Sequence, residues 1–577
     1  MNLNHNLQIT IKSKWLLLIA CLGTSPVIVF CCFYLFSSYS YLAEWYLRMN
    51  NCFYQQAHWK DDFFTVHTKQ QGNIFCAAGL IISIPLLYHL IRHFKKTSAS
   101  LKLQFSKWNI LIALLCILTG TAAWLWGYSL VHQGFDEAFS AVNCASLPPF
   151  QTLSYYMLPN NHILFNVLNG VLFHFAGDKV FTGKLISLVC FWGIIAVVFA
   201  WLSGIIKNKL LLAIATIVIS LQFPIWGFGF EARGYELYSL AEWFSFFAII
   251  KYVNTKNSQW LYYHALACIS GYLCIPTFMY FHVAFLLFGL LWMIYTREPD
   301  AKFWRVQLNI ILIAYLLYLP AICFSGIHAL VGNPYVTGNI HTLQELYDKG
   351  IDRFTLYLNY YTSHFTADHS KLDWMLFLSP ITLFCFYKNK LAVLCGLFYL
   401  AMWLTCIMLA YAMKIYALER TVSGHVSISL ALTIYVLYLL LSKLNNVWRM
   451  PIIGDVVLMI FLVVAGINFS NGNKENVSMR LYDNDINEKY NLLMNEGISL
   501  IPKGSSIAFS EQCFYWYYQC KIRGDKVNKC SIGNEQYFVR FGSDLFPVSD
   551  PEKYVLIKTV FKEGVTAVGY GIYKRER

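Results

Sequence analysis

Long apolar segments separated by short polar ones dominate the chain up to residue 468. A bilayer core of about 30 Å needs a helix of about 20 apolar residues, and most of these segments approach that length. Open sheets would leave backbone groups unsatisfied in lipid, so the segments are expected to be helices. The sequence therefore predicts an all-α polytopic membrane protein with about 13 transmembrane helices. The predicted spans are 15–36, 73–92, 108–130, 184–206, 209–226, 235–253, 260–275, 277–296, 307–327, 373–387, 391–412, 423–442 and 452–468.

The polar segment 131–183 contains an amphipathic stretch. Apolar residues recur at helical spacing over 163–175, whereas polar residues such as Asn166 lie largely off that apolar stripe. Asn160 or Asn161 could cap the start of such a helix. We expect in-plane helices in this loop, lying on the membrane surface.

The composition changes after the last span, where residues 470–577 become polar. Short β-like runs occur at 506–509, 554–559 and 565–573, and a helical stretch covers roughly 486–500. This segment is predicted to be a small α/β domain of normal size. The expected divisions are N-terminal transmembrane helices with a basic loop at 1–107, the main transmembrane module at 108–469, and this domain at 470–577.

Charge supports the same organisation. Hydrophobic residues make up 57% of the chain and charged residues 13%, about half the charged share of soluble domains. Lysine and arginine concentrate in alternate short loops, so the net charge of +13 is explained by topology and no nucleic-acid partner is expected. The rule that basic loops stay inside predicts a plasma (inner) membrane protein with 131–183, 328–372 and the C-terminal domain extracytoplasmic. One disulfide among Cys513, Cys520 and Cys530 is then allowed, with the pair left open.

Two adjacent carboxylates, Asp136 and Glu137, directly follow the third predicted span. They could simply begin a helix, because Asp is a good N-cap. They could also supply a general base where lipid meets water, since ionisable groups at a membrane are costly and usually functional.

Further candidates lie on the same predicted side. Glu231, Arg233 and Tyr235 precede the sixth span, and His162 opens the amphipathic stretch. An interfacial anchor explains the Arg and Tyr equally well, and a lone interfacial His is more often a satisfied polar residue than a catalyst.

Two cations, Lys414 and Arg420, lie with Glu419 in a short outer loop, against the topology rule. The loop could hold an exposed ion pair or clamp an anionic group such as phosphate, which Arg binds in bidentate fashion. Arg353 in the second long loop is a further candidate for the same role.

In this order and on this side, the motifs resemble those of the GT-C glycosyltransferases, most closely the bacterial relatives of protein O-mannosyltransferases and of the lipid A aminoarabinose transferase. That family has an acidic pair in the first outer loop, a His-containing in-plane helix, an acidic residue followed by Arg-x-Tyr, and a late Arg before a span. The matching residues are Asp136, Glu137, His162, Glu231, Arg233, Tyr235 and Arg420. Two departures are the two spans that precede the one leading to the acidic pair, and the Ile163-Leu164 that follows His162 where the family often has His-Pro-Pro.

The resemblance implies that a sugar passes from a polyprenyl-phosphate donor to a lipid, glycan or protein acceptor on the outer face, by an inverting single displacement. Its expected catalytic residues are Asp136, Glu137 and Glu231. Its expected substrate-binding residues are His162, Arg233, Tyr235, Arg353, Lys414 and Arg420. A divalent metal ion between Asp136 and Glu231 stays open, because members of the family differ in metal use.

Two other functions use a similar layout. A lipid-linked glycan polymerase or ligase would also work with outer loops and a polyprenyl donor. A flippase or transporter would need charged residues buried within spans. Such residues look nearly absent from the spans, which favours an enzyme.

Overall fold

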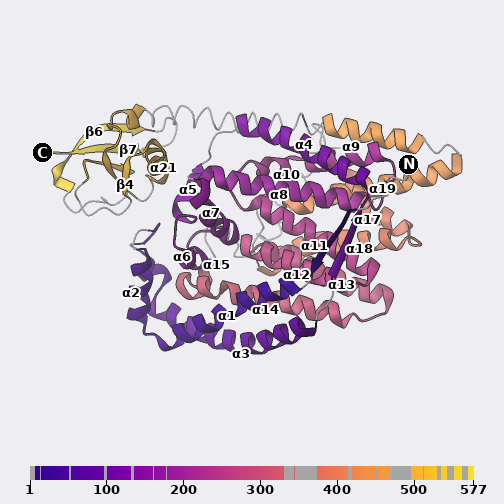
Figure 1. Ribbon diagram of the computed structural model, residues 1–577, viewed down its shortest axis with the longest axis horizontal. Helices are drawn as coiled ribbons and strands as arrows, with labels where there is room; N and C mark the ends of the chain where they lie inside the picture. The colour runs from indigo at the N-terminus through magenta and orange to yellow at the C-terminus, as the bar shows by residue number, and fades with distance from the viewer. Residues whose placement is uncertain are drawn as a thin grey trace.

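A computed structural model shows a mostly helical chain with a small C-terminal sheet at one end of its long axis (Figure 1). The structure describes residues 7–12, 14–50, 53–56, 58–96, 100–130, 135–159, 161–176, 179–330, 344, 348, 373–413, 419–448, 453–467, 470, 496–510, 513–528, 535–541, 551–561 and 569–576.

Helices follow one another along almost the whole chain. Those up to the acidic segment are α1 (Lys14–Phe36), α2 (Tyr39–Met49), the short π-helix η1 (Trp59–Phe63), α3 (Val66–Lys96), α4 (Lys107–Leu130), α5 (Phe135–Asn143), α6 (Pro149–Ser154) and α7 (Ile163–Ala176). They continue with α8 (Lys179–Leu202), α9 (Lys209–Ser220), α10 (Phe223–Gly229), α11 (Tyr235–Thr255), α12 (Gln259–Cys274), α13 (Phe278–Thr296), α14 (Ala301–Ser325) and α15 (Ile327–Leu330). The last are α17 (Asp373–Cys385), α18 (Lys390–Met413), the 3-10 helix η2 (Glu419–Val422), α19 (Ser423–Trp448) and a helix at 453–467.

Each predicted span overlaps helix in the structure. Within the described residues, six helices are long and apolar enough to cross a membrane, namely α3, α4, α8, α13, α14 and α19. Together with the low charged content, these helices make the chain an integral membrane protein. The number of about 13 spans stays a prediction.

The predicted span 209–226 is wrong as a single helix, because the chain forms α9 and α10 there. Gln222 is extended between them, and Pro224 lies in the first turn of α10. Proline lacks the N–H that a continuing helix needs and is favoured in a first turn, so it separates the two helices.

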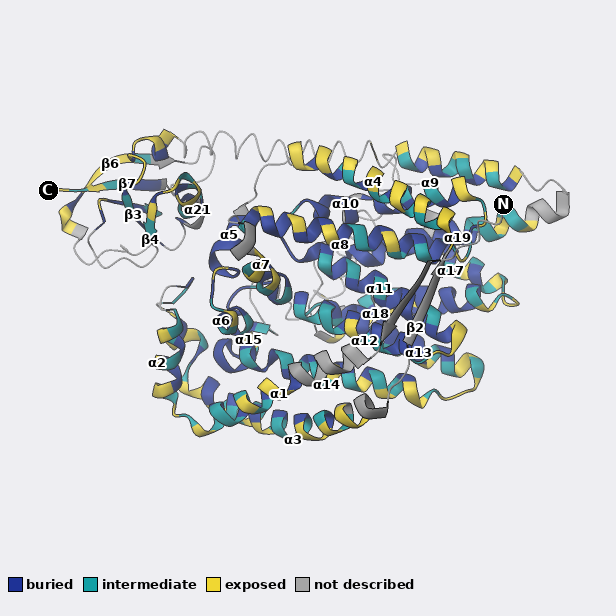
Figure 2. Ribbon diagram, in the orientation of Figure 1, coloured by how far each residue is buried: buried dark blue, intermediate teal, exposed yellow. Residues whose placement is uncertain are grey.

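Several helices have exposed faces (Figure 2), and large apolar residues lie on them. On α4 the exposed residues include Leu111, Leu114, Leu115 and Leu118, which recur at helical spacing. A patch of this kind would be unfavourable in water and is typical of a surface that faces lipid. The buried centre contains α8, α11 and the first half of α19 instead.

The two long helices before α4, α1 and α3, pack onto the rest of the molecule through α14. α1 contacts α3, and both contact α14. The hydroxyl of Tyr34 donates to the backbone oxygen of Cys323 at 3.1 Å, and the indole N–H of Trp59 donates to that of Phe324 at 2.9 Å. The N-terminal helices are therefore part of the same packed body.

A two-stranded sheet was missed by the sequence analysis. β1 (Leu7–Lys12) pairs antiparallel with β2 (Ser100–Phe105). Both segments alternate apolar and polar residues, which is the period of a strand. The pairing ties the chain start to the basic loop between α3 and α4.

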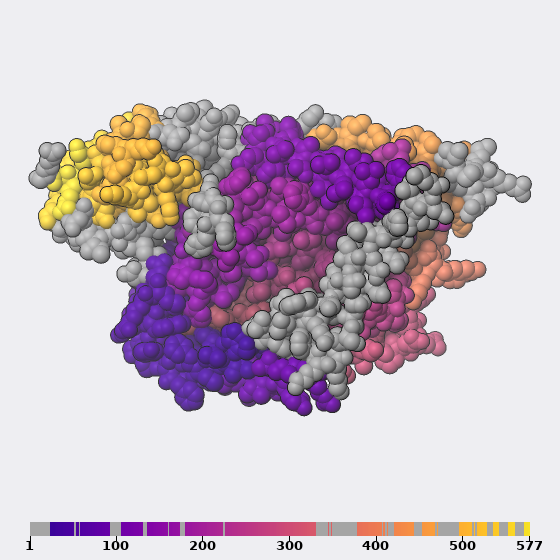
Figure 3. Space-filling view, viewed as in Figure 1, coloured from indigo at the N-terminus to yellow at the C-terminus, as the bar shows by residue number. Residues whose placement is uncertain are grey.

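The C-terminal domain is α/β, as predicted, with strand order β4-β3-β5-β7-β6. Its elements are β3 (Ser506–Phe509), α21 (Phe514–Arg523), β4 (Lys526–Asn528), β5 (Tyr537–Phe541), η4 (Pro551–Lys553), β6 (Tyr554–Phe561) and β7 (Gly569–Arg575). β3 was predicted with its bounds, whereas α21, β4 and β5 were missed, and most of the predicted helix 486–500 lies outside the described residues. The domain forms a lobe at one end of the molecule (Figure 3), and α21 packs against α5.

Cys513 and Cys520 are not joined to each other, and Cys530 lies outside the described residues. Burial raises the pKa of the Cys520 thiol to about 12, which keeps the thiol protonated and poorly reactive. No disulfide therefore joins the first two cysteines.

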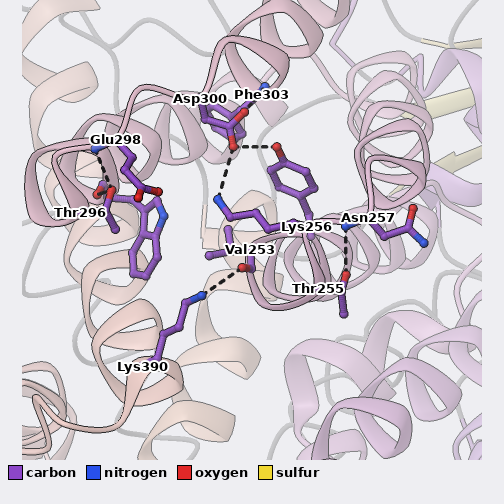
Figure 4. A network of polar contacts seen from close by, with 11 residues as sticks. Val253, Thr255, Lys256, Asn257, Thr296, Glu298, Asp300, Phe303 and Lys390 are labelled. Atoms are coloured by element: carbon purple, nitrogen blue, oxygen red, sulfur yellow. Dashed lines mark hydrogen bonds and ion pairs between the residues drawn. The ribbon is translucent and has the colours of Figure 1, made fainter.

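A network of polar contacts holds the ends of several spans together (Figure 4). Asp300 accepts a hydrogen bond from the hydroxyl of Tyr252 at 2.6 Å and lies 3.8 Å from the Lys256 ammonium. Lys390 donates to the backbone oxygen of Val253 at 3.4 Å. These contacts fix the last turn of α11 against the starts of α14 and α18, in loops that the charge pattern predicts to be cytoplasmic.

Candidate active site

The acidic pair lies in the first turn of α5, where carboxylates interact favourably with the helix dipole. Neither residue caps the helix, since α5 already begins at Phe135. The side chain of Asp136 is 45% exposed and that of Glu137 only 6%, because neighbouring residues on a helix point about 100° apart. One carboxylate therefore reaches solvent while the other enters the protein.

Glu137 anchors a distant turn. Its Oε1 accepts a hydrogen bond from the backbone N–H of Ala232 at 2.6 Å. The same oxygen lies 3.7 Å from Nζ of Lys184 on α8, and both side chains are buried. A buried carboxylate needs such partners, so this contact fixes the segment before α11 against α5 and α8.

Arg233 lies next to Asp136 and is almost fully buried. Its Nη1 donates to Oδ2 of Asp136 at 2.6 Å, and the centre of its guanidinium group lies 4.8 Å from the ring centre of Tyr235. Burial lowers the pKa of the Arg233 guanidinium, but Tyr235 and the nearby carboxylates raise it, and the net shift is upward. A permanent cation therefore orients the exposed carboxylate.

His162 joins this group through the backbone. Its Nδ1 accepts a hydrogen bond from the N–H of Gly234 at 3.0 Å, and its ring packs edge-on against Tyr235 at 4.7 Å. A Cβ added to Gly234 would lie 2.6 Å from that nitrogen. Only glycine leaves room for the contact, and the accepting role requires Nδ1 to carry no proton.

α7 buries its asparagines and exposes part of its apolar surface. Ser140 donates to Oδ1 of Asn166 at 2.7 Å, Asn166 donates to Asn161 at 2.9 Å, and Asn161 donates to the backbone oxygen of Thr152 at 2.8 Å. The amide of Asn161, one of the two expected caps, thus joins α6 to α7 and does not cap the helix. The exposed residues are Leu168, Val171 and Leu172.

The site collects five of the predicted residues, from segments about a hundred residues apart. They are Asp136, Glu137, His162, Arg233 and Tyr235. Glu231 belongs to the same turn, and its backbone oxygen accepts a hydrogen bond from Ser187 at 2.6 Å. Arg353 and Lys414 lie outside the described residues, and only the backbone of Arg420, in η2, is described.

Several buried polar residues near the site were missed. Lys184 opens a predicted span, where a lysine normally indicates only topology. Glu236, Glu242 and His425 are fully buried within helices, so the expectation that spans nearly lack charged residues is wrong. The apolar context of Glu242 was the signal that could have revealed it.

Metal ligands do not gather in the described part of the chain. No group of three or more His, Cys, Asp or Glu side chains there could hold a metal ion. Oδ2 of Asp136 is already ion-paired with the guanidinium group of Arg233. A metal between Asp136 and Glu231 thus stays a prediction, and no chemical step is derived from it.

Comparisons with known proteins yield only distant similarities. No protein-family model matches the chain, and no curated protein sequence does. The structure of ArnT from Cupriavidus metallidurans bound to undecaprenyl phosphate is 9% identical, with a TM-score of 0.46, over 80% of this chain and 97% of that one. Its apo structure is 8% identical with a TM-score of 0.48 over the same shares.

A third similar structure is the archaeal oligosaccharyltransferase AglB from Archaeoglobus fulgidus, in complex with an inhibitory peptide and a dolichol-phosphate. It is 9% identical, with a TM-score of 0.39, over 75% of this chain and 69% of that one. Similarities at this level do not by themselves establish a fold or a family.

Proposed function

We propose that this chain is a membrane glycosyltransferase that transfers a sugar from a polyprenyl-phosphate donor to an acceptor, as the resemblance of its motifs to the GT-C family implies. The observation that carries the proposal is the contact of Asp136 and Glu137 with the turn at 232–235. Each motif alone is weak support for this function, but several of them meet at the half-exposed carboxylate of Asp136.

Asp136 acts as the general base. Its carboxylate, oriented by Arg233 at Oδ2, takes the proton of an acceptor hydroxyl. The acceptor oxygen then attacks the anomeric carbon, and the bond from that carbon to the phosphate oxygen breaks. The electron pair leaves with the polyprenyl phosphate, and the anomeric configuration inverts.

The departing phosphate needs a cation. Arg233 is buried and bound to Asp136, so it orients the base instead of contacting the donor. Arg420 in η2, with Lys414 from the same loop and Arg353 from the second long outer loop, supplies the positive charge.

The membrane arrangement belongs to the same proposal. About 13 spans place α5, α7 and the C-terminal domain on the extracytoplasmic side of the plasma (inner) membrane. The exposed apolar residues of α7 support an in-plane position, with Leu168 and Val171 toward lipid. The proposed donor then presents its sugar at the level of Asp136.

One observation favours a second function, that of a transporter for a lipid-linked glycan. Glu242 and His425 are buried within helices, as in many transport pathways. The two functions differ in chemistry, because a transporter leaves the bond between sugar and phosphate intact.

The test uses purified protein in nanodiscs with donor lipids extracted from the native membrane. Mass spectrometry should detect free polyprenyl phosphate and a glycosylated acceptor. Movement of intact donor across liposomes without release of polyprenyl phosphate would instead support the transporter. Mass spectrometry of surface glycans and glycoproteins from a deletion strain then identifies the acceptor.

A further inference from the structure

α11 and α19 lie side by side and run in the same direction. Oγ of Ser239 lies 2.8 Å from Oγ of Ser423, and one helical turn farther on the indole N–H of Trp243 donates to Oγ of Ser427 at 2.8 Å. Both contacts join residues that are 184 positions apart. The two helices are therefore parallel and held in one register.

An acid–base pair occupies the middle of this contact. Oε1 of Glu242 lies 3.0 Å from Nδ1 of His425, and both side chains are buried. The atoms are at ion-pair distance, although none of the four polar atoms makes a well-aligned hydrogen bond within the described residues. A Cβ added to Gly424 would overlap the carboxylate of Glu242, so the helices touch closely there and leave little room to slide.

Burying such a pair costs free energy that an apolar pair would not. Its best-attested use is to fix the register of packed helices, because a slip leaves both groups unpaired in an apolar interior. The pair lies one residue from Trp243 on α11 and two from Ser423 on α19, between the two neutral contacts. In this position the pair can fix the register of α19 on α11.

The register determines where η2 lies. η2 directly precedes α19, and Arg420 is three residues before Ser423. The same offset of 184 residues brings the backbone of Arg420 to about the level of Glu236, in the first turn of α11. Arg233 and Tyr235 lie immediately before that level, in contact with Asp136.

We propose that Glu242 and His425 are positioning residues for donor binding. They hold α19 in register on α11 and so keep η2 at the level of the turn that carries Arg233, from where Arg420 binds the donor phosphate beside Asp136. This inference rests on the proposed function, in which Arg420 contacts that phosphate. Neither Glu242 nor His425 touches the substrate.

The first experiment measures the affinity of the purified full-length protein in nanodiscs for undecaprenyl phosphate. Glu242→Gln and Arg420→Ala should each weaken binding roughly tenfold, the loss typical of one charge-assisted hydrogen bond. Because Glu242 acts through Arg420, the double variant should bind no more weakly than Arg420→Ala alone. Losses that multiply to roughly a hundredfold would overturn the inference, since independent effects add in free energy.

The second experiment measures how α11 and α19 are aligned along their length, with no ligand present. Ser239→Cys with Ser423→Cys should form a disulfide when copper phenanthroline is added, located by peptide mass spectrometry. Glu242→Gln should reduce that yield, and His425→Gln gives the same test if the first variant fails to fold. The control is Asp300→Asn, whose partners on α11, Tyr252 and Lys256, lie at the opposite end of that helix, and it should preserve the yield.

The outcomes separate the two proposals. An unchanged disulfide yield in Glu242→Gln would overturn the register role, whatever the affinities are. A reduced yield with unchanged affinity in Arg420→Ala would support the register role and overturn the phosphate contact of the proposed function instead.

Discussion

Asp136→Asn tests the proposed base most directly. Asn has nearly the same size and its side-chain oxygen can still accept from Arg233, but it cannot take a proton. General base catalysis contributes roughly 10²–10⁴-fold, so sugar transfer should fall at least about a hundredfold. That loss corresponds to about 2.7 kcal/mol in the activation barrier.

Stability should change much less. The Asp136 side chain is 45% exposed, and the Asn oxygen can still accept from Arg233, so the buried guanidinium group keeps a hydrogen-bond partner. The variant should therefore fold, melt within a few degrees of the parent, and bind undecaprenyl phosphate with unchanged affinity. This separation of turnover from binding is what a base, and not a packing residue, produces.

The assay follows release of polyprenyl phosphate from native donor lipids. The matched control is Asp300→Asn, which also removes a carboxylate next to a cation and at a helix start, but at the opposite end of α11. Its turnover should stay near that of the parent protein. Parent-level turnover in Asp136→Asn would refute the base and leave Asp136 as a residue that only stabilises the start of α5.

Three other changes follow from the site. Lys184→Met removes the ammonium group that lies beside the buried Glu137 carboxylate. The free energy of unfolding, measured by heat or denaturant, should fall by about 3–5 kcal/mol. A fall below about 1 kcal/mol would contradict the buried ion pair. Gly234→Ala should lower turnover and thermal stability together, because the new methyl group displaces the neighbouring imidazole, and parent-like values in both measurements would argue against that contact. Engineered cysteines in 131–183 should react with an impermeant reagent added to intact cells, whereas those in 93–106 should not, and labelling of the second set would overturn the topology.

The helical framework was largely readable from the sequence because lipid imposes it. An apolar segment of the right length has one stable structure in a bilayer, so segments such as 108–130 and 184–206 were placed within a few residues. The break at Pro224 was missed because hydropathy alone does not register a single residue that lacks an N–H. In the C-terminal domain α21 was missed, since its apolar and charged residues show little periodicity.

The candidate site could be predicted from the sequence only in part. Chain order suggested which motifs belong together, and the contact of Asp136 with Arg233 brings two of them within hydrogen-bond distance. The sequence does not show that Asp136 is exposed and Glu137 buried, because this difference depends on how α5 is rotated against α8. The role of Lys184 is equally hidden, since its partner Glu137 lies 47 residues away, on α5.

The two predicted spans before α4 are compatible with the proposed site for a topological reason. α1 and α3 are antiparallel neighbours packed on α14, so they form a hairpin. A hairpin returns the chain to the side of the membrane where it started, and α4 then delivers Asp136 to the same face as it would without the addition. A single added span would reverse α4 and every helix after it. An even number of added spans is therefore the form of insertion that leaves the proposed outer site intact.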